Sequence, residues 1–136
     1  MSIQRALYQL LKTTPVPGNR IYALRAPQNV TAPFVVYQRI AGERDHHLKG
    51  ASGIVQARFL IDVYDREYHA SRLLAADIED VLDGYSGIVA FGNDSPQETI
   101  KVAAITCQSD VDLMDESDEP FLYRVSTDYL ITYHQE

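Results

Sequence analysis

The sequence predicts an α+β fold, in which an antiparallel or mixed sheet of about five strands carries two helices on one face. Residues 55–63 place an apolar side chain at every second position, the pattern of a strand buried on one face. Residues 66–82 then change to the period of an amphipathic helix. The segments are consecutive and no βαβ unit is repeated, so we expect the helix to pack back on an antiparallel sheet.

This central helix has a predicted beginning, apolar stripe and end. Asp65 lies between the strand and the helix, where an N-cap residue accepts hydrogen bonds from the first turn. Asp83 and Gly84 provide the stop, because glycine adopts the left-handed conformation that ends many helices. The stripe expected to face the sheet consists of Ala70, Leu74, Ile78, Val81 and Leu82.

The remaining elements follow from local patterns. Ser2 is expected to cap a first helix of about three turns, ended by Pro15, Pro17 and Gly18, with an apolar face of Ile3, Leu7, Leu10 and Leu11. Strands are predicted at 20–24, 34–40 and 99–107, with a brief one at 87–91. Residues 26–33 are expected to form an irregular, proline-bounded connection, and residues 92–96 a turn.

The last strand is predicted at 121–133, where apolar and polar residues alternate over the whole length. This alternation places its tyrosines in the core, so we do not expect them to stack on a base. The predicted core joins the two best strands to the central helix through Phe59, Ile61, Tyr123, Val125, Tyr129, Leu74 and Ile78.

Length and composition indicate one soluble domain covering residues 1–136. The apolar fraction is 46% and the charged fraction 23%, as in ordinary globular proteins. No apolar run approaches the roughly 20 residues of a membrane span. The first twelve residues form an amphipathic pattern unlike a signal peptide, so we expect the protein to stay in the cytoplasm where it is made. Cys107 is the one cysteine, which excludes an internal disulfide.

The net charge of −7 is unevenly distributed along the chain. Residues 1–72 contain ten Lys or Arg against five Asp or Glu, whereas residues 73–136 contain two against fourteen. Folding either mixes these charges or leaves opposite poles, and opposite poles would suit head-to-tail association between copies. The basic residues are spread singly and are not interleaved with aromatics, so we expect no sequence-specific nucleic-acid binding.

No group of residues assembles a catalytic or metal site in the sequence, and we expect no cofactor. His46 and His47 are adjacent and lack partners at metal-ligand spacing. Cys107 lies in an apolar strand and is expected to pack in the core. Between residues 109 and 120 we expect a solvated loop without the spacing of a calcium loop, although it carries Asp110, Asp112, Asp115, Glu116, Asp118 and Glu119.

Residues 41–52 have lost both periodicities and are expected to form a long exposed loop. A long polar loop between two well-anchored strands gives a partner an adaptable surface. We therefore take its central residues as candidates for partner contact: Glu43, Arg44, Asp45, His46, His47, Leu48 and Lys49.

Several segments, in their order along the chain, resemble the tail-completion family of long-tailed bacteriophages and prophages, also called tail terminators or tail-to-head joining proteins. They are RIYALRAPQ at 20–28, PFVVYQRIAGERDHHLKG at 33–50, SGIVQARFLIDVYD at 52–65, the helix ending in VLDG, and FLYRVSTDYLITY at 121–133. The likeness covers almost the whole chain and is weakest at 86–107. No single segment is diagnostic, and their joint order carries the resemblance.

The resemblance implies a non-enzymatic virion protein, assembled in the host cytoplasm and located at the head-proximal end of the tail. Such a protein forms a homo-hexameric ring that stops polymerisation of the tail tube protein and contacts the head-completion or connector protein. DNA passes through the ring, and an acidic protein suits that passage because it repels phosphates.

Two alternatives stay open at this point. One is a different neck component of the phage, such as a head-completion protein, which would differ mainly in its partners. The other is a small metal-dependent enzyme or ligand-binding α+β domain that uses His46, His47 and the acidic residues.

Overall fold

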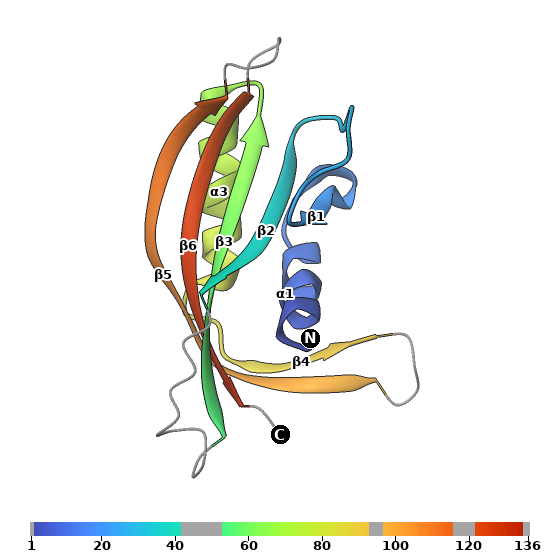
Figure 1. Cartoon of the computed structure of the whole chain (residues 1–136), viewed down its shortest axis with the longest axis vertical. Helices are drawn as coiled ribbons and strands as arrows, with labels where there is room; N and C mark the ends of the chain where they lie inside the picture. Colours follow the sequence, from blue (N-terminus) through green and yellow to red (C-terminus); the bar gives the residue numbers. More distant parts are fainter. Residues whose placement is uncertain (1, 42–52, 93–96, 116–121, 135–136) are drawn as a thin grey trace.

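The computed structural model describes residues 2–41, 53–92, 97–115 and 122–134 (Figure 1). In chain order the elements are α1 (Ser2–Lys12), a 3-10 turn η1 (Pro17–Asn19), β1 (Ile21–Ala23), β2 (Phe34–Ala41), β3 (Ile54–Asp65), α3 (Tyr68–Leu82), β4 (Gly87–Phe91), β5 (Glu98–Asp115) and β6 (Leu122–His134).

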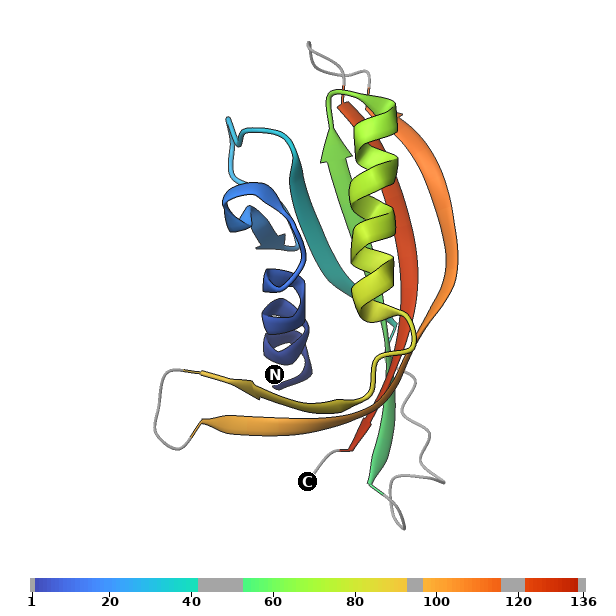
Figure 2. The same ribbon diagram turned by 180° about the vertical axis from the view of Figure 1, so that it is seen from behind.

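The strands form one mixed sheet with the order β1-β2-β3-β6-β5-β4. All neighbouring strands are antiparallel except β1 and β2, which are parallel. Both helices lie on the same face of the curled sheet, α3 over β3, β5 and β6, and α1 beside β4 and β1 (Figures 1 and 2). The predicted α+β class is confirmed, and the sheet has six strands where about five were expected.

The core lies between the helices and the inward-facing residues of β3 and β6. Phe59 lies opposite Tyr129 in the register, and both side chains are fully buried. The predicted core is confirmed apart from Tyr123, which is half-buried and packs edge-on against Tyr68 with ring centroids 5.8 Å apart. The inward-facing buried residues are Val55, Ala57, Phe59, Ile61 and Val63 on β3, and Val125, Tyr129, Ile131 and Tyr133 on β6.

The first helix is confirmed. Ser2 is its first helical residue, whereas we expected Ser2 to be the capping residue just before the helix. A one-residue difference at a helix end is within the ordinary variation of helix boundaries. Its buried face contains one residue that the prediction lacked, Ala6. Arg5 and Lys12 lie outside this face and are exposed.

The central helix begins later than predicted, at Tyr68, and its N-cap residue is Glu67. Asp65 still pairs with Tyr123 in the sheet, so the strand extends to this residue and the helix begins beyond it. Its Oδ1 instead accepts hydrogen bonds from the backbone amides of Arg66 and Glu67, at 2.7 and 3.4 Å, in the turn before the helix. The predicted N-cap at Asp65 is therefore wrong by two residues.

The buried face of α3 is also slightly rotated from the predicted stripe. Leu74, Ile78 and Leu82 are buried as expected. Ser71 and Ala75 complete the face, while Ala70 and Val81 are only partly buried. The Ser71 hydroxyl tolerates burial because it donates a hydrogen bond to the carbonyl of Tyr68 at 2.6 Å.

The helix ends where predicted, and its end is bonded to β5. Gly84 has a φ of +82°, a left-handed conformation that glycine adopts without strain. This turn lets the Gly84 amide donate to the carbonyl of Ile105 at 2.8 Å. The Asp83 Oδ1 accepts from the Cys107 amide at 2.9 Å, beside a β-bulge between Cys107 and Ser109. These bonds fix the position of α3 along the sheet.

The predicted acidic loop is wrong in its first part, because β5 continues to Asp115. Residues 109–115 pair with β6, so the ladder satisfies the backbone despite the low strand propensity of aspartate. Arg72 and Tyr68 on α3 bind two of the carboxylates. The predicted strands at 20–24, 34–40 and 87–91 are confirmed as β1, β2 and β4. Residues 116–121 lie outside the described residues.

Candidate interaction surfaces

The predicted partner-contact loop, Glu43 to Lys49, lies outside the residues that the structure describes. Its two anchoring strands are described: β2 ends at Ala41 and β3 begins at Ile54, and the two pair antiparallel. The histidines proposed as weak metal candidates, His46 and His47, fall in the same segment. The structure therefore leaves the contact role of this loop as an expectation.

The described residues do not bring together three or more His, Cys, Asp or Glu side chains in a group that could hold a metal ion. Cys107 is partly buried against the core, and its Sγ lies 3.6 Å from Oε1 of Glu79. Burial, followed by the nearby Glu79 carboxylate, raises the pKa of Cys107 to about 11. The group is therefore a thiol at neutral pH and a poor nucleophile. Within the described chain, no helix has the length and apolar character needed to cross a membrane.

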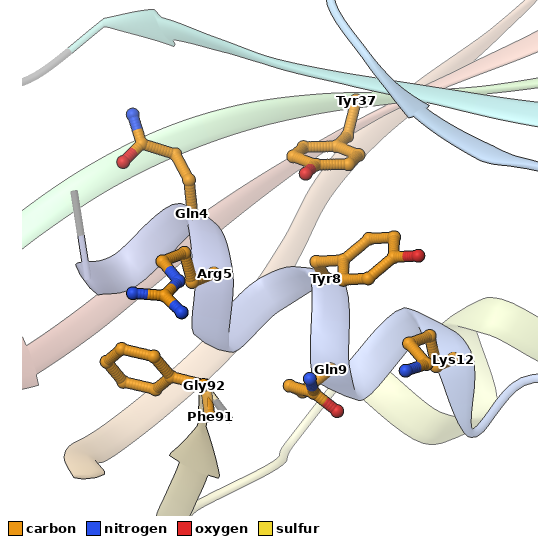
Figure 3. A pocket seen from close by; sticks show the side chains of 8 residues that line it. All are labelled: Gln4, Arg5, Tyr8, Gln9, Lys12, Tyr37, Phe91 and Gly92. Carbon is orange, nitrogen blue, oxygen red and sulfur yellow. The ribbon is translucent and has the colours of Figure 1, made fainter. Parts of the chain in front are cut away.

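A groove of about 340 Å³ runs along the exposed side of α1, between this helix, the middle of β2 and the end of β4. Figure 3 shows Arg5 near the Phe91 ring, and Lys12 further along the same helix. Tyr8 and Gln9 lie between these two cations along the helix. The residues that line this groove are Gln4, Arg5, Tyr8, Gln9, Lys12, Tyr37, Phe91 and Gly92.

A second cavity of about 320 Å³ shares Gln4, Arg5 and Tyr37 with the first, so the two are adjacent. It adds a third cation, Arg39, and the exposed apolar side chain of Leu24. We call the two cavities together the α1 groove. The second cavity is lined by Gln4, Arg5, Ala23, Leu24, Tyr37, Gln38, Arg39 and Phe59.

Two of the three cations of the α1 groove lie over aromatic rings. The guanidinium carbon of Arg5 lies 5.1 Å from the centroid of Phe91, and the Lys12 Nζ lies 5.5 Å from that of Tyr8. Arg5 also forms an exposed ion pair of 3.3 Å with Glu98. Burial, followed by the nearby Tyr8, raises the pKa of Tyr37, so the Tyr37 hydroxyl is a neutral hydrogen-bonding group at pH 7.

One polar atom of the groove wall has no partner among the described residues. The Oε1 of Gln4 is buried and accepts no hydrogen bond there. A buried acceptor without a donor costs about 1–3 kcal/mol, so a ligand that brings a donor would recover this energy. The groove therefore offers three cations, neutral amides and aromatic rings, which suits an acidic peptide segment.

A second candidate surface is the sheet face opposite the helices. Arg58 of β3 pairs with Asp128 of β6, and Arg124 of β6 lies 3.9 Å from Oδ2 of Asp62. The guanidinium of Arg124 also donates to the Tyr64 hydroxyl at 3.2 Å. Asp62 is buried, which raises its pKa against the opposing effects of Ser126 and Arg124. These pairs tie neighbouring strands together across the face.

A third surface is the distal end of β5, beside the start of α3. The Tyr68 hydroxyl donates to Oδ2 of Asp112 at 2.6 Å. Arg72 lies 3.3 Å from Asp110 and 3.1 Å from Asp112, so a single cation faces two carboxylates. Val111, Leu113 and Met114 are exposed apolar side chains in the same stretch. This surface, residues 110–114, is the acidic end of β5.

Sequence reasoning missed the α1 groove although part of its signal was visible. Arg5, Gln9 and Lys12 recur on the polar side of the first helix, which by itself indicates only a solvated face. The facing wall comes from β4 and β2, and its position depends on the curl of the sheet. That curl is a tertiary property for which the sequence carried no separate pattern.

Two comparisons with known proteins identify the fold and the family of the chain, and a third finds no curated protein that matches it. A solved structure described as "Virion of native gene transfer agent (GTA) particle" has a similar fold, with a TM-score of 0.72. The sequences are 15% identical, and the match covers 98% of this chain and 95% of the other. The likeness shows the fold, including the curled sheet with both helices on one face.

The second comparison matches residues 5–134 to the family described as "Tail completion protein gp17". The match contains every described strand and most of α1, so it rests on the whole fold and not on one segment. The chain therefore belongs to the tail completion protein gp17 family, and it is a structural component of a phage tail located in the virion.

Proposed function

We propose that the protein caps the head-proximal end of the tail tube as a hexameric ring, ends tail growth and joins the tail to the head connector. The observation that carries this proposal is the family match over residues 5–134. The role needs no catalytic step, since capping and joining are binding events.

The charge distribution supports assembly into a closed ring. A ring needs heterologous contacts, in which one surface of a copy meets a different surface of the next. The α1 groove carries Arg5, Lys12 and Arg39, while the acidic end of β5 carries Asp110 and Asp112. Copies with complementary surfaces attract in one orientation and repel in others, which favours a single mode of contact.

The net charge supports passage of DNA through such a ring. At −7 per copy the protein repels phosphates, because its 19 Asp and Glu outnumber its 12 Lys and Arg. DNA would then move through the ring without adhering to it. The tail tube protein and the head-completion protein are the proposed partners on the two sides of the ring.

The residues proposed to contact a partner are Glu43 to Lys49. They include two cations, two histidines and two acids, and they show no regular apolar pattern, so we expect polar contacts and little contribution to the core. Loops of this kind bind partners from a rigid scaffold, here the β2–β3 hairpin.

Deletion of the gene from its phage or prophage tests the proposal. We expect tails of abnormal length that do not join heads, and restoration of normal infectious particles when the gene is supplied in trans. The negative control is the deletion strain that carries the empty vector. Normal joined particles from the deletion strain would contradict the proposed function.

A further inference from the structure

We infer that the α1 groove of one copy binds the acidic end of β5 of a second copy. The inference rests on the proposed ring and adds the two surfaces that would form its contact. It identifies the occupant of the groove as residues 110–114 of a neighbouring chain.

The groove has the charge that this occupant requires. None of its lining residues is a carboxylate, and among the described residues neither Lys12 nor Arg39 takes part in an ion pair. Arg5 is paired with Glu98, but both side chains are more than half exposed, so the pair is weak. The unpartnered Oε1 of Gln4 can accept from a backbone amide of an incoming strand.

The acidic end of β5 has the complementary properties. Asp110 and Asp112 are 41% and 45% exposed, and within the described part of the chain Arg72 is the one cation that both contact, so a negative charge remains. The Val111 and Leu113 side chains beside them are exposed and apolar. In the groove they would meet Leu24, which is 72% exposed. The two surfaces are therefore complementary in charge, and both carry exposed apolar side chains.

The two surfaces of one copy lie far apart on the molecule. Figures 1 and 2 both place the end of β5 beside the start of α3, whereas the start of α1 lies beside β4 at the other end of the sheet. A chain cannot fill its own groove with its own β5 end, so contact requires a second copy. Each copy then offers one groove and one acidic end, which is a head-to-tail contact.

Charge reversal at each surface tests this contact by light scattering after size-exclusion chromatography. The groove variant is Lys12→Glu with Arg39→Glu, and the acidic-end variant is Asp110→Lys, which leaves Arg72 paired with Asp112. We expect each variant alone to dissociate at protein concentrations at least tenfold higher than the wild type. An equimolar mixture should regain assembly beyond the dimer, because the native groove meets the native acidic end at one contact and the reversed charges meet at the next.

Matched controls reverse charge outside both surfaces, at Lys101→Glu on β5 and Asp80→Lys on α3, and should assemble as the wild type does. The combined variant Lys12→Glu with Asp110→Lys should regain assembly through the exchanged charges. Melting temperatures show whether each variant is folded. If the charge-reversed groove variant does not fold, the neutral variant Lys12→Gln with Arg39→Gln is tested in its place.

Assembly of the groove variants equal to that of the wild type would overturn the inference, as would a mixture that stays monomeric. A wild type that is monomeric at all concentrations, yet restores phage particles in the deletion strain, would also overturn it while leaving the proposed capping and joining role intact. Failure of the wild-type gene to restore particles would instead contradict the function.

Discussion

Phe59 of β3 is one of the largest fully buried side chains of the core, and it lies opposite Tyr129 of β6 in the sheet. Its replacement by alanine removes a ring and leaves a cavity, so Phe59→Ala should cost about 3–5 kcal/mol in the free energy of unfolding. Denaturation in urea measures this value. Leu73→Ala on the exposed side of α3 is the control, with an expected change within about 0.5 kcal/mol. A cost below about 1 kcal/mol for Phe59→Ala would contradict its assigned place.

Asp62 gives the stability a predicted dependence on pH. Burial raises its pKa, so the folded protein keeps the proton to a higher pH than the unfolded chain does. The contribution of Asp62 to the free energy of unfolding is then fully present below the ordinary pKa of aspartate and is lost as pH rises through the raised pKa. An asparagine at this position stays neutral at every pH, so Asp62→Asn should be more stable than the wild type at pH 7.

The difference between Asp62→Asn and the wild type should shrink as the pH falls toward about 4, where the aspartate is also neutral. Urea denaturation across this range measures it, with the exposed Asp80→Asn as a matched control. Lower stability of Asp62→Asn at pH 7 would show that the ion pair with Arg124 outweighs the cost of burial.

At the scale of elements, the sequence predicted the strands that show local alternation, but not the features that depend on contacts with neighbouring strands and helices. β3 and β6 were found because a sheet with one covered face imposes a period of two on both. The extension of β5 through Asp110 and Asp112 was missed because aspartate disfavours strands. In the structure, pairing with β6 and the Arg72 side chain outweigh that propensity.

The start of α3 was misplaced for the same reason. Asp65 has the residue type and local position of an N-cap, but its pairing with Tyr123 in the sheet decides its conformation. Among the candidate sites, the α1 groove needed the positions of β2 and β4 around the helix. Both features arise from contacts between segments distant in sequence, which single-sequence patterns do not record.

The connection between β2 and β3 carries a prediction of its own. Replacing Glu43 to Gly50 by a short glycine-serine link changes the closure entropy by only about 0.6 kcal/mol per doubling of length. We therefore expect a folded protein with a nearly unchanged melting temperature that fails to restore infectious particles in the deletion strain. A glycine-serine link of the original length separates the effect of loop length from that of its side chains. Normal particles from the shortened variant would contradict the contact role of this loop.

For the whole molecule, the uneven charge predicts that self-association weakens with salt. Raising the ionic strength from about 0.05 to 0.5 M shortens the screening length to a few Å, which weakens attraction between exposed charges. Light scattering should show hexamers shifting toward smaller species. The Lys12→Glu and Arg39→Glu variant should show less of this dependence, since its groove no longer attracts the acidic end. Assembly that strengthens with salt would indicate a mainly apolar interface.

The central claim is that the protein completes the tail, and its location in phage mutants blocked at other steps tests this most directly. A mutant that makes no heads accumulates free tails, and a mutant that makes no tails accumulates filled heads. Quantitative immunoblotting of the purified particles, with electron microscopy of labelled samples, measures where the protein is bound. We predict about six copies per free tail, at one end only, and none on the heads. Protein found on heads from the tail-less mutant and absent from free tails would contradict the account and indicate a head-completion protein.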